Sequence, residues 1–203
     1  MSSEQLSDEI LVQKAREGDT KAFEELFDRY KKQLLNFIYR LIGNRETAEE
    51  VTQEVFIKVY NKLEIFDPSK KFVSWIYTIA RNLAKNALRD KKYFSARSLE
   101  ETVVPGDETM HLKDVIADSS AGPDQIIEDD ELAEDAQRVL DSMPIKYREV
   151  IALCSVQGLT YKEAAVVLGC SIASISVRLE EAKLLFMKKL GIDMPGRKES
   201  DSL

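Results

Sequence analysis

Cationic and amide side chains gather along one predicted helix, in the stretch SWIYTIARNLAKNALRDKKYF at residues 74–94. At 100° per residue its apolar side chains, Trp75 included, share one arc, and Asn82 lies at the border of a second arc. This second arc carries four residues spaced four apart, followed by two lysines: Tyr77, Arg81, Lys85 and Arg89, then Lys91 and Lys92. Cations hold phosphates and aromatic rings stack on unpaired bases, so the surface suits single-stranded nucleic acid better than duplex. A merely solvated basic face is the alternative for the stripe, and core packing is the interpretation that we favour for Trp75.

A second candidate surface is the outer face of the preceding helix, expected at residues 45–63. Its apolar side chains, Tyr60 among them, are expected to point inward. The outward positions are mostly acidic or amide: Glu49, Glu50, Gln53, Glu54 and Lys58. An acidic helix face repels DNA, so this face is either solvated or a docking surface for a basic protein surface.

Residues 160–179 have the spacing of a helix-turn-helix. Ala165 is small enough for two helices to cross closely, Gly169 can adopt the positive φ of a sharp turn, and Ile175 can pack the second helix on the first. Thr160 with Glu163 predicts a capping box at the first helix, and Ser171 can cap the second. An ordinary helical hairpin with a glycine turn is the alternative.

The second helix of this motif has an outer face that is unusual for a reader of duplex DNA. Six residues are expected to be buried: Ile172, Ile175, Leu179, Ala182, Phe186 and Leu190. The opposite face shows apolar and acidic residues: Ala173, Val177, Glu180, Glu181 and Leu184. Reading the major groove favours arginine, lysine, asparagine or glutamine, so we expect the duplex affinity of this helix to be low.

The sequence offers no constellation for catalysis or metal binding. Cys154 and Cys170 are the only cysteines, and His111 is the only histidine. Two cysteines cannot complete a four-ligand zinc site, and no serine or cysteine has a histidine to activate it. We therefore expect no enzyme activity, no metal and no cofactor.

The elements that position these surfaces are predicted to be helical throughout. The fold class is all-α, with a helical bundle at 1–94, an acidic linker at 95–130, a helix-turn-helix domain at 131–190 and a tail at 191–203. Across residues 98–131 eleven acidic side chains oppose one lysine, a net charge of −10, within a chain of net charge −7. No window reaches a membrane span and no signal peptide is evident, which predicts a cytoplasmic protein.

Three segments in this order resemble the extracytoplasmic-function (ECF) sigma factors of bacterial RNA polymerase: AEEVTQEVFIKVYNKL, FVSWIYTIARNLAKNALR and GLTYKEAAVVLGCSIASISVRLEEAK. The likeness covers about residues 8–94 and 130–190. It implies a factor that directs core polymerase to specific promoters and assists promoter melting, with the polymerase clamp and flap, promoter DNA and an anti-sigma factor as partners. The acidic linker would thread the polymerase cleft where RNA will pass.

The resemblance also implies site residues. Single-stranded minus-ten DNA would be bound by the third helix and the loop before it, through Asn82, Lys85, Asn86, Arg89, Lys91 and Lys92. The polymerase clamp would be bound by the second helix, through Glu50, Gln53 and Glu54. Duplex minus-35 DNA would be bound by Ser174, Ser176, Arg178 and Lys183. Ala173, Ser176, Glu180 and Glu181 depart from the family's basic pattern.

Two other functions remain open at this point. A sigma-like decoy would bind an anti-sigma factor without recognising promoters, and the exposed apolar strip of the last helix would suit it. A dimeric helix-turn-helix repressor would leave the first helical bundle without a role.

Overall fold

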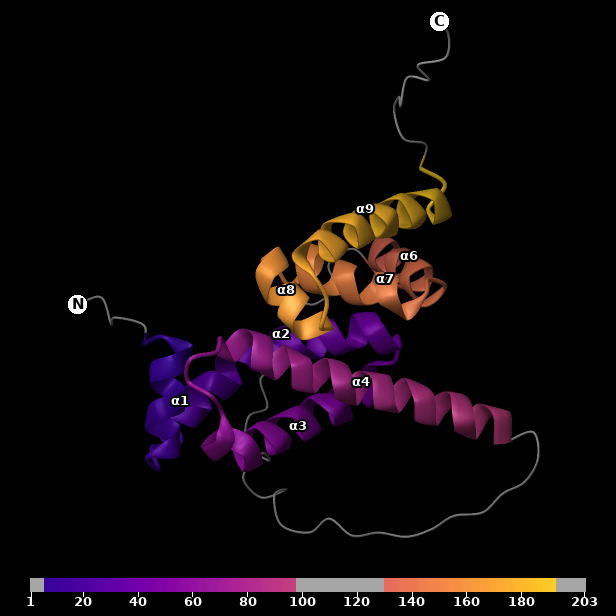
Figure 1. The fold of residues 1–203 in the computed structure, drawn as a ribbon. Helices are drawn as coiled ribbons and strands as arrows, with labels where there is room; N and C mark the ends of the chain where they lie inside the picture. Colours follow the sequence, from indigo (N-terminus) through magenta and orange to yellow (C-terminus); the bar gives the residue numbers. More distant parts are fainter. Residues whose placement is uncertain (1–5, 98–129, 193–203) are drawn as a thin grey trace, which may run out of the picture.

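The computed structural model describes the backbone of residues 6–97 and 130–192, with side chains at 6–90 and 134–192. The described residues contain helices and turns and no strand, which confirms the all-α prediction. The predicted linker and tail fall almost wholly outside these residues. The N-terminal unit comprises α1 (Asp8–Arg16), α2 (Thr20–Ile42), α3 (Arg45–Lys62), the 3-10 turn η1 (Leu63–Ile65) and α4 (Phe72–Arg97) (Figure 1).

A two-residue turn separates α2 from α3, and each residue ends or begins a helix. Gly43 adopts a left-handed φ of 74° and donates its backbone N–H to the carbonyl of Tyr39, 2.8 Å away. The side chain of Asn44 then accepts from the N–H of Thr47 at 2.8 Å. Glycine tolerates positive φ and asparagine is a strong N-cap, so the pair reverses the chain and lets α3 pack back on α2.

The core of the N-terminal unit follows the apolar period of α2. Leu34, Phe37 and Ile38 are fully buried, and the ring of Phe37 meets that of Tyr77 edge-on, with centroids 5.1 Å apart. Near the other end, Tyr30 meets Phe72 in the same geometry at 5.5 Å. Helix α4 is therefore fixed against α2 at two aromatic contacts.

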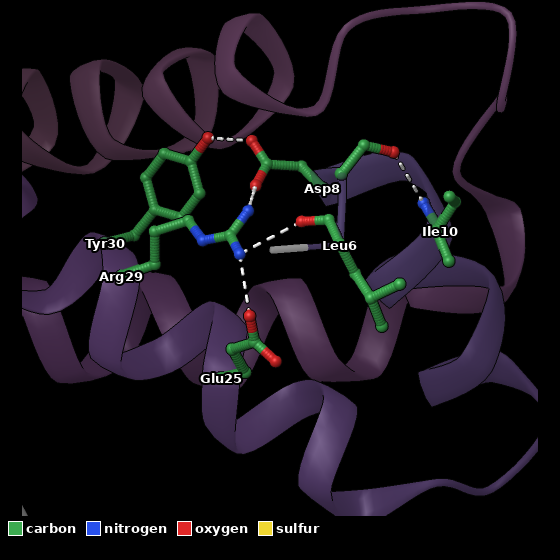
Figure 2. Close-up of polar contacts among 7 residues, drawn as sticks. Leu6, Asp8, Ile10, Glu25, Arg29 and Tyr30 are labelled. Atoms are coloured by element: carbon green, nitrogen blue, oxygen red, sulfur yellow. Dashed lines mark hydrogen bonds and ion pairs between the residues drawn. The ribbon is translucent and has the colours of Figure 1, made fainter. Parts of the chain in front are cut away.

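A partly buried polar cluster anchors α1 to α2 (Figure 2). Both Arg29 and Tyr30 donate to the carboxylate of Asp8 in the first turn of α1. Arg29 also reaches the carbonyl of Leu6 at 3.1 Å and Glu25 at 2.7 Å. Burial raises the pKa of Tyr30, and its hydrogen bond to Asp8 raises it further.

The C-terminal unit comprises α6 (Asp130–Asp141), α7 (Ile145–Val150), the π-helical turn η2 (Ile151–Val156), α8 (Tyr161–Leu168) and α9 (Ile172–Lys189). Helix α7 does not continue as a regular α-helix, because the wider π turn of η2 follows it directly. The predicted capping box of Thr160 and Glu163 is present, Gly169 has φ 64°, and Ser171 caps α9. The helix-turn-helix geometry is thus confirmed.

The two units pack directly on one another. Helices α6 and α7 and the turn η2 contact α2, and α8 contacts α4 (Figure 1). Across this boundary Arg81 of α4 forms a two-pronged ion pair with Glu149 of α7, at 2.7 and 3.4 Å. Tyr77 donates to the side-chain oxygen of Gln157 at 3.1 Å.

Candidate functional site

The outer face of α4 presents four polar side chains at helical spacing. Residues three and four apart share one face of a helix, so Asn82, Lys85, Asn86 and Arg89 form a continuous strip. All four are exposed. The strip combines two amides, which can recognise a base edge, with two cations, which can hold a backbone. The side chains of Lys91 and Lys92 lie outside the described residues.

The cations of this strip are free to bind an external anion. Arg89 meets Asp90 at 3.6 Å, but both side chains are more than half exposed, at 75% and 60%. Exposed pairs of this kind contribute only about 0–1 kcal/mol and are screened by salt. Among the described residues, no ion pair holds Lys85. A phosphate could therefore displace solvent at little cost.

The loop between η1 and α4 adds exposed groups that our sequence analysis located only as a loop. Lys70 and Lys71 are exposed immediately before the first turn of α4, and Ile65 is 78% exposed. Asp67 shapes the loop by accepting from the backbone N–H and the hydroxyl of Ser69, at 3.0 and 2.7 Å. The lysine pair directly before a predicted helix was the available signal, because helix N-termini and cations both attract phosphate.

Trp75 packs against the two aromatic residues that flank this loop. Its ring lies 4.9 Å from that of Phe66 and 5.8 Å from that of Phe72, centroid to centroid. The side chain is partly buried against the core. The interpretation of Trp75 as core packing is confirmed.

The basic stripe predicted along α4 is only half exposed, which corrects the sequence analysis. Tyr77 is fully buried, and Arg81 has a side chain only 18% exposed because Glu149 pairs with it. The helical period placed these two beside Lys85 and Arg89 correctly. It could not show that the C-terminal unit covers the first half of the stripe.

The outer face of α3 carries the acidic and amide residues as predicted. Glu50, Gln53 and Glu54 are exposed, and Glu54 pairs with Lys58 at 2.7 Å in one helical turn. Tyr60, expected to point inward, is 55% exposed and meets Phe23 edge-on at 5.2 Å. The face is thus acidic with an exposed aromatic ring near its C-terminal end.

On α9 the four predicted DNA contacts lie on two sides of the helix. At 100° per residue Ser174 and Arg178 fall on one side, and Ser176 and Lys183 lie roughly 160° away. The hydroxyl of Ser174 is also held by the cap, 2.8 Å from that of Ser171. Three exposed apolar residues occupy the face between the pairs: Ala173, Val177 and Leu184.

Two further details of α9 differ from simple expectation. Ile172, predicted to be buried, is 50% exposed, since burial of a first helical residue depends on where the neighbouring helix ends. Glu181 is not wholly free, because it accepts from the hydroxyl of Tyr147 at 3.1 Å. Glu180 is exposed and is the stronger source of repulsion toward phosphate.

The described residues contain neither a group of metal ligands nor a membrane-spanning helix. Within residues 6–97 and 130–192, no three His, Cys, Asp or Glu side chains are grouped so as to hold a metal ion. Within the same ranges, no helix has the length and apolar character needed to cross a bilayer.

Comparison with known proteins assigns both units. Residues 26–93 match the family model described as Sigma-70 region 2, and residues 133–185 match Sigma-70, region 4. The chain is 30% identical over 182 residues to the ECF RNA polymerase sigma factor SigW of Bacillus subtilis, covering 88% of this chain and 94% of SigW. It is 31% identical over 190 residues to the ECF RNA polymerase sigma-E factor of Escherichia coli, covering 89% and 93%.

Two solved structures share the fold. CnrH, in complex with the cytosolic domain of CnrY, gives a TM-score of 0.66 at 22% identity, covering 92% of this chain and 99% of CnrH. RpoE of Bartonella quintana, in complex with the anti-sigma factor NepR, gives 0.62 at 22% identity, covering 86% and 99%. The similarity thus spans both helical units.

Proposed function

The chain belongs to the ECF family of RNA polymerase sigma factors. On this basis we propose which partner each of its described surfaces binds. The protein directs bacterial RNA polymerase core to promoters and is a non-enzymatic initiation factor. We also propose the roles of its residues and a cytoplasmic location. The observation that carries them is the exposed strip Asn82, Lys85, Asn86 and Arg89 on α4.

The α4 strip binds the unpaired minus-ten strand. The amide of Asn82 both donates hydrogen bonds to and accepts them from the edge of a base that has left the stack. Asn86, one turn further on, offers a second amide to the same strand. Lys85 and Arg89 hold the backbone, together with Lys91 and Lys92. The loop cations Lys70 and Lys71 extend the same positive surface toward the N-terminus of α4.

The α3 face binds the polymerase clamp. Glu50, Gln53 and Glu54 project away from the N-terminal core and from the C-terminal unit, which packs on α2 and α4. A basic surface on the polymerase complements this face and repels a nucleic acid from it. Promoter strand and polymerase therefore meet different helices of the same unit.

The C-terminal unit binds the minus-35 duplex and the polymerase flap. Arg178 and Lys183 supply the cations, with Ser174 and Ser176 beside them, while Glu180 opposes binding. Because few phosphates are neutralised, this contact is weak and depends on the polymerase holding the unit in place.

An anti-sigma factor is the proposed regulator. The RpoE structure with a similar fold is a complex with an anti-sigma factor. Here the exposed apolar strip of Ala173, Val177 and Leu184 on α9 offers a surface for it. A decoy without promoter recognition gains no support over a functional sigma factor, since the similarity to promoter-directing relatives covers both units.

The test is initiation by purified core polymerase on a promoter template with a premelted bubble, with and without this protein. We expect specific transcripts only when the protein is present. If a correctly folded protein binds core polymerase but produces no specific transcript, the assignment of the α4 strip is contradicted. A protein that ignores core and binds only an anti-sigma factor would favour the decoy.

A further inference from the structure

Helix α1 has no part in the surfaces proposed above, but its first turn is bonded to the side chain of Tyr30 on α2. We propose that Asp8 of α1 and Tyr30 are positioning residues for the loop at 66–71, which leads into α4. The inference rests on the proposed function, in which Lys70 and Lys71 of this loop extend the positive surface. The link between α1 and the loop can be measured without any partner.

The loop depends on its two ends for its direction. Residues 67–71 are all exposed, whereas Phe66 and Phe72 on either side of them are buried. Within the loop, Asp67 accepts from the backbone N–H and the hydroxyl of Ser69. Such short-range bonds fix the shape of a turn but not its direction relative to the rest of the protein. The direction is therefore set where the two buried rings pack.

The two rings at the ends of the loop belong to one aromatic cluster. Phe66 and Phe72 meet edge-on with centroids 5.8 Å apart, and Trp75 packs against both. Tyr30 of α2 meets Phe72 edge-on at 5.5 Å. Closely packed rings with a preferred mutual geometry pass a shift of one ring to the next. A displacement of Tyr30 therefore moves the end of the loop.

A single carboxylate on α1 holds the ring of Tyr30 in place (Figure 2). Asp8 accepts from the Tyr30 hydroxyl through one oxygen and from the Arg29 guanidinium through the other. Tyr30 is buried, and a buried phenol hydroxyl needs a hydrogen-bond partner. Hydrogen bonds to an ionised carboxylate are stronger than those between neutral groups. Tyr30 is thus held by α1 at its hydroxyl and by Phe72 at its ring.

Helix α1 is itself a firm support for this bond. Leu11 and Val12 are buried in the core of the N-terminal unit. The helix also contacts η1, the turn that leads into the loop, where Arg16 lies 3.9 Å from Glu64. Because Glu64 is exposed, this ion pair contributes little. The bond between Asp8 and Tyr30 is therefore the stronger polar link from α1 toward the loop.

The direction of the loop matters because its cations and the α4 strip are proposed to bind one strand. Lys71 directly precedes Phe72 at the start of α4, and Lys85 lies about 20 Å further along the helix at 1.5 Å per residue. Charged hydrogen bonds to a phosphate weaken when distance or angle departs from the preferred geometry. A strand held at Lys85 therefore meets Lys71 only if the loop keeps its direction.

The single tryptophan of the chain, Trp75, reports on the loop in the free full-length protein without a label. Acrylamide quenching of its fluorescence measures how accessible the indole ring is. We expect Tyr30→Phe, which removes only the hydroxyl, to raise the quenching constant and to shift the emission to longer wavelength. Asp8→Ala should have the same effect through Tyr30. Phe72→Leu, which alters a ring in contact with Trp75, should give the largest effect.

A destabilised control separates positioning of the loop from general loosening of the fold. Leu41→Ala opens a cavity at a buried site about three turns further along α2 and should cost at least as much stability as Tyr30→Phe. Urea unfolding verifies the loss of stability, and circular dichroism verifies that each variant keeps its helices. We expect Leu41→Ala to be quenched as the parent is. Parental quenching in both Tyr30→Phe and Asp8→Ala, or an equal increase in Leu41→Ala, would overturn the positioning.

A double-mutant cycle tests the consequence for the promoter strand. In the assembled enzyme, Lys71→Ala should weaken binding of the minus-ten strand, and it should weaken binding less when Tyr30→Phe is present. We expect the two losses of affinity to differ at least about twofold, as coupled side chains do. Lys85→Ala should cost the same in both backgrounds, because α4 carries Lys85 independently of the loop.

The outcomes of the cycle separate this inference from the proposed function. Equal losses from Lys71→Ala with and without Tyr30→Phe would overturn the consequence for the strand. If Lys71→Ala costs nothing in the parent, the role of the loop cations under the proposed function is contradicted. The fluorescence of Trp75 still decides the positioning in that case.

Discussion

Tyr77 of α4 donates a hydrogen bond to Gln157, 3.1 Å away, across the boundary between the two helical units. The phenol ring also packs edge-on against Phe37 in the N-terminal core. One side chain therefore belongs to the core of one unit and to its contact with the other.

This burial predicts a loss of stability at high pH. Burial raises the pKa of Tyr77, and burial with the Asp8 hydrogen bond raises that of Tyr30. Since both folded-state pKa values lie above the unfolded value of about 10, the stabilisation is complete below pH 10 and lost above it. Urea unfolding should show the free energy of unfolding falling by about 1.4 kcal/mol per pH unit for each tyrosine.

Tyr77→Phe should remove one of the two contributions, and Tyr161→Phe, at an exposed position, should leave the slope unchanged. An identical slope in Tyr77→Phe and the parent would show that Tyr77 ionises freely in the folded chain.

Asn82→Ala should lower initiation about tenfold or more and leave core binding intact. Its amide is assigned to an extruded base, and losing such a contact costs about 1–3 kcal/mol. Transcription from a bubble template and core affinity are measured side by side. Gln33→Ala, an exposed amide on α2, serves as the control. Equal loss of both activities would refute the assignment.

Glu54→Lys should weaken association with core polymerase before any effect on promoter opening appears. The change reverses charge on the α3 face and removes the pairing with Lys58. Affinity for core, measured by titration of labelled protein, reports it directly. Glu17→Lys makes the same charge change at the exposed end of α1. Unchanged affinity in Glu54→Lys would remove Glu54 from the interface.

Lys85→Ala should reduce the salt dependence of minus-ten strand binding by the assembled enzyme. Each phosphate contact to a single strand contributes about 0.7 to the slope of log affinity against log salt. We expect a decrease of this size in Lys85→Ala and none in Lys21→Ala, which lies at the exposed start of α2. A full parental slope would mean that Lys85 meets no phosphate.

Opposite substitutions on α9 should move duplex binding in opposite directions. Arg178→Ala should lower the salt slope for a minus-35 duplex by about 0.9, and Glu180→Lys should raise it by a similar amount. Competition binding by the assembled enzyme, repeated over a series of salt concentrations, provides the slopes. If neither variant changes the slope, α9 does not face the duplex.

Local patterns in the sequence were sufficient to predict most of the helices and their ends. The helical period of residues 74–94 placed their apolar side chains on one arc, and Gly169 and Thr160 marked helix ends that the structure confirms. These signals are local because a cap or a turn depends on a few neighbouring residues. The exposed α4 strip followed from the same period.

The contact between the units could not be derived in this way. Arg81 and Glu149 lie 68 positions apart, and Arg148 and Leu41 lie 107 apart. A helical wheel shows which side chains share a face, but not which other element covers that face. For this reason Tyr77 and Arg81 were expected on an open surface and Tyr60 in the core.

The most direct test of the central claim is crosslinking from α4 in an assembled open promoter complex. A photoreactive amino acid replaces Asn82 in one protein and Gln33 in the control, and the crosslinked nucleotides are mapped. We predict that position 82 labels the unpaired minus-ten strand and position 33 does not. Absence of any nucleotide crosslink from position 82, in a complex that initiates normally, would contradict the account.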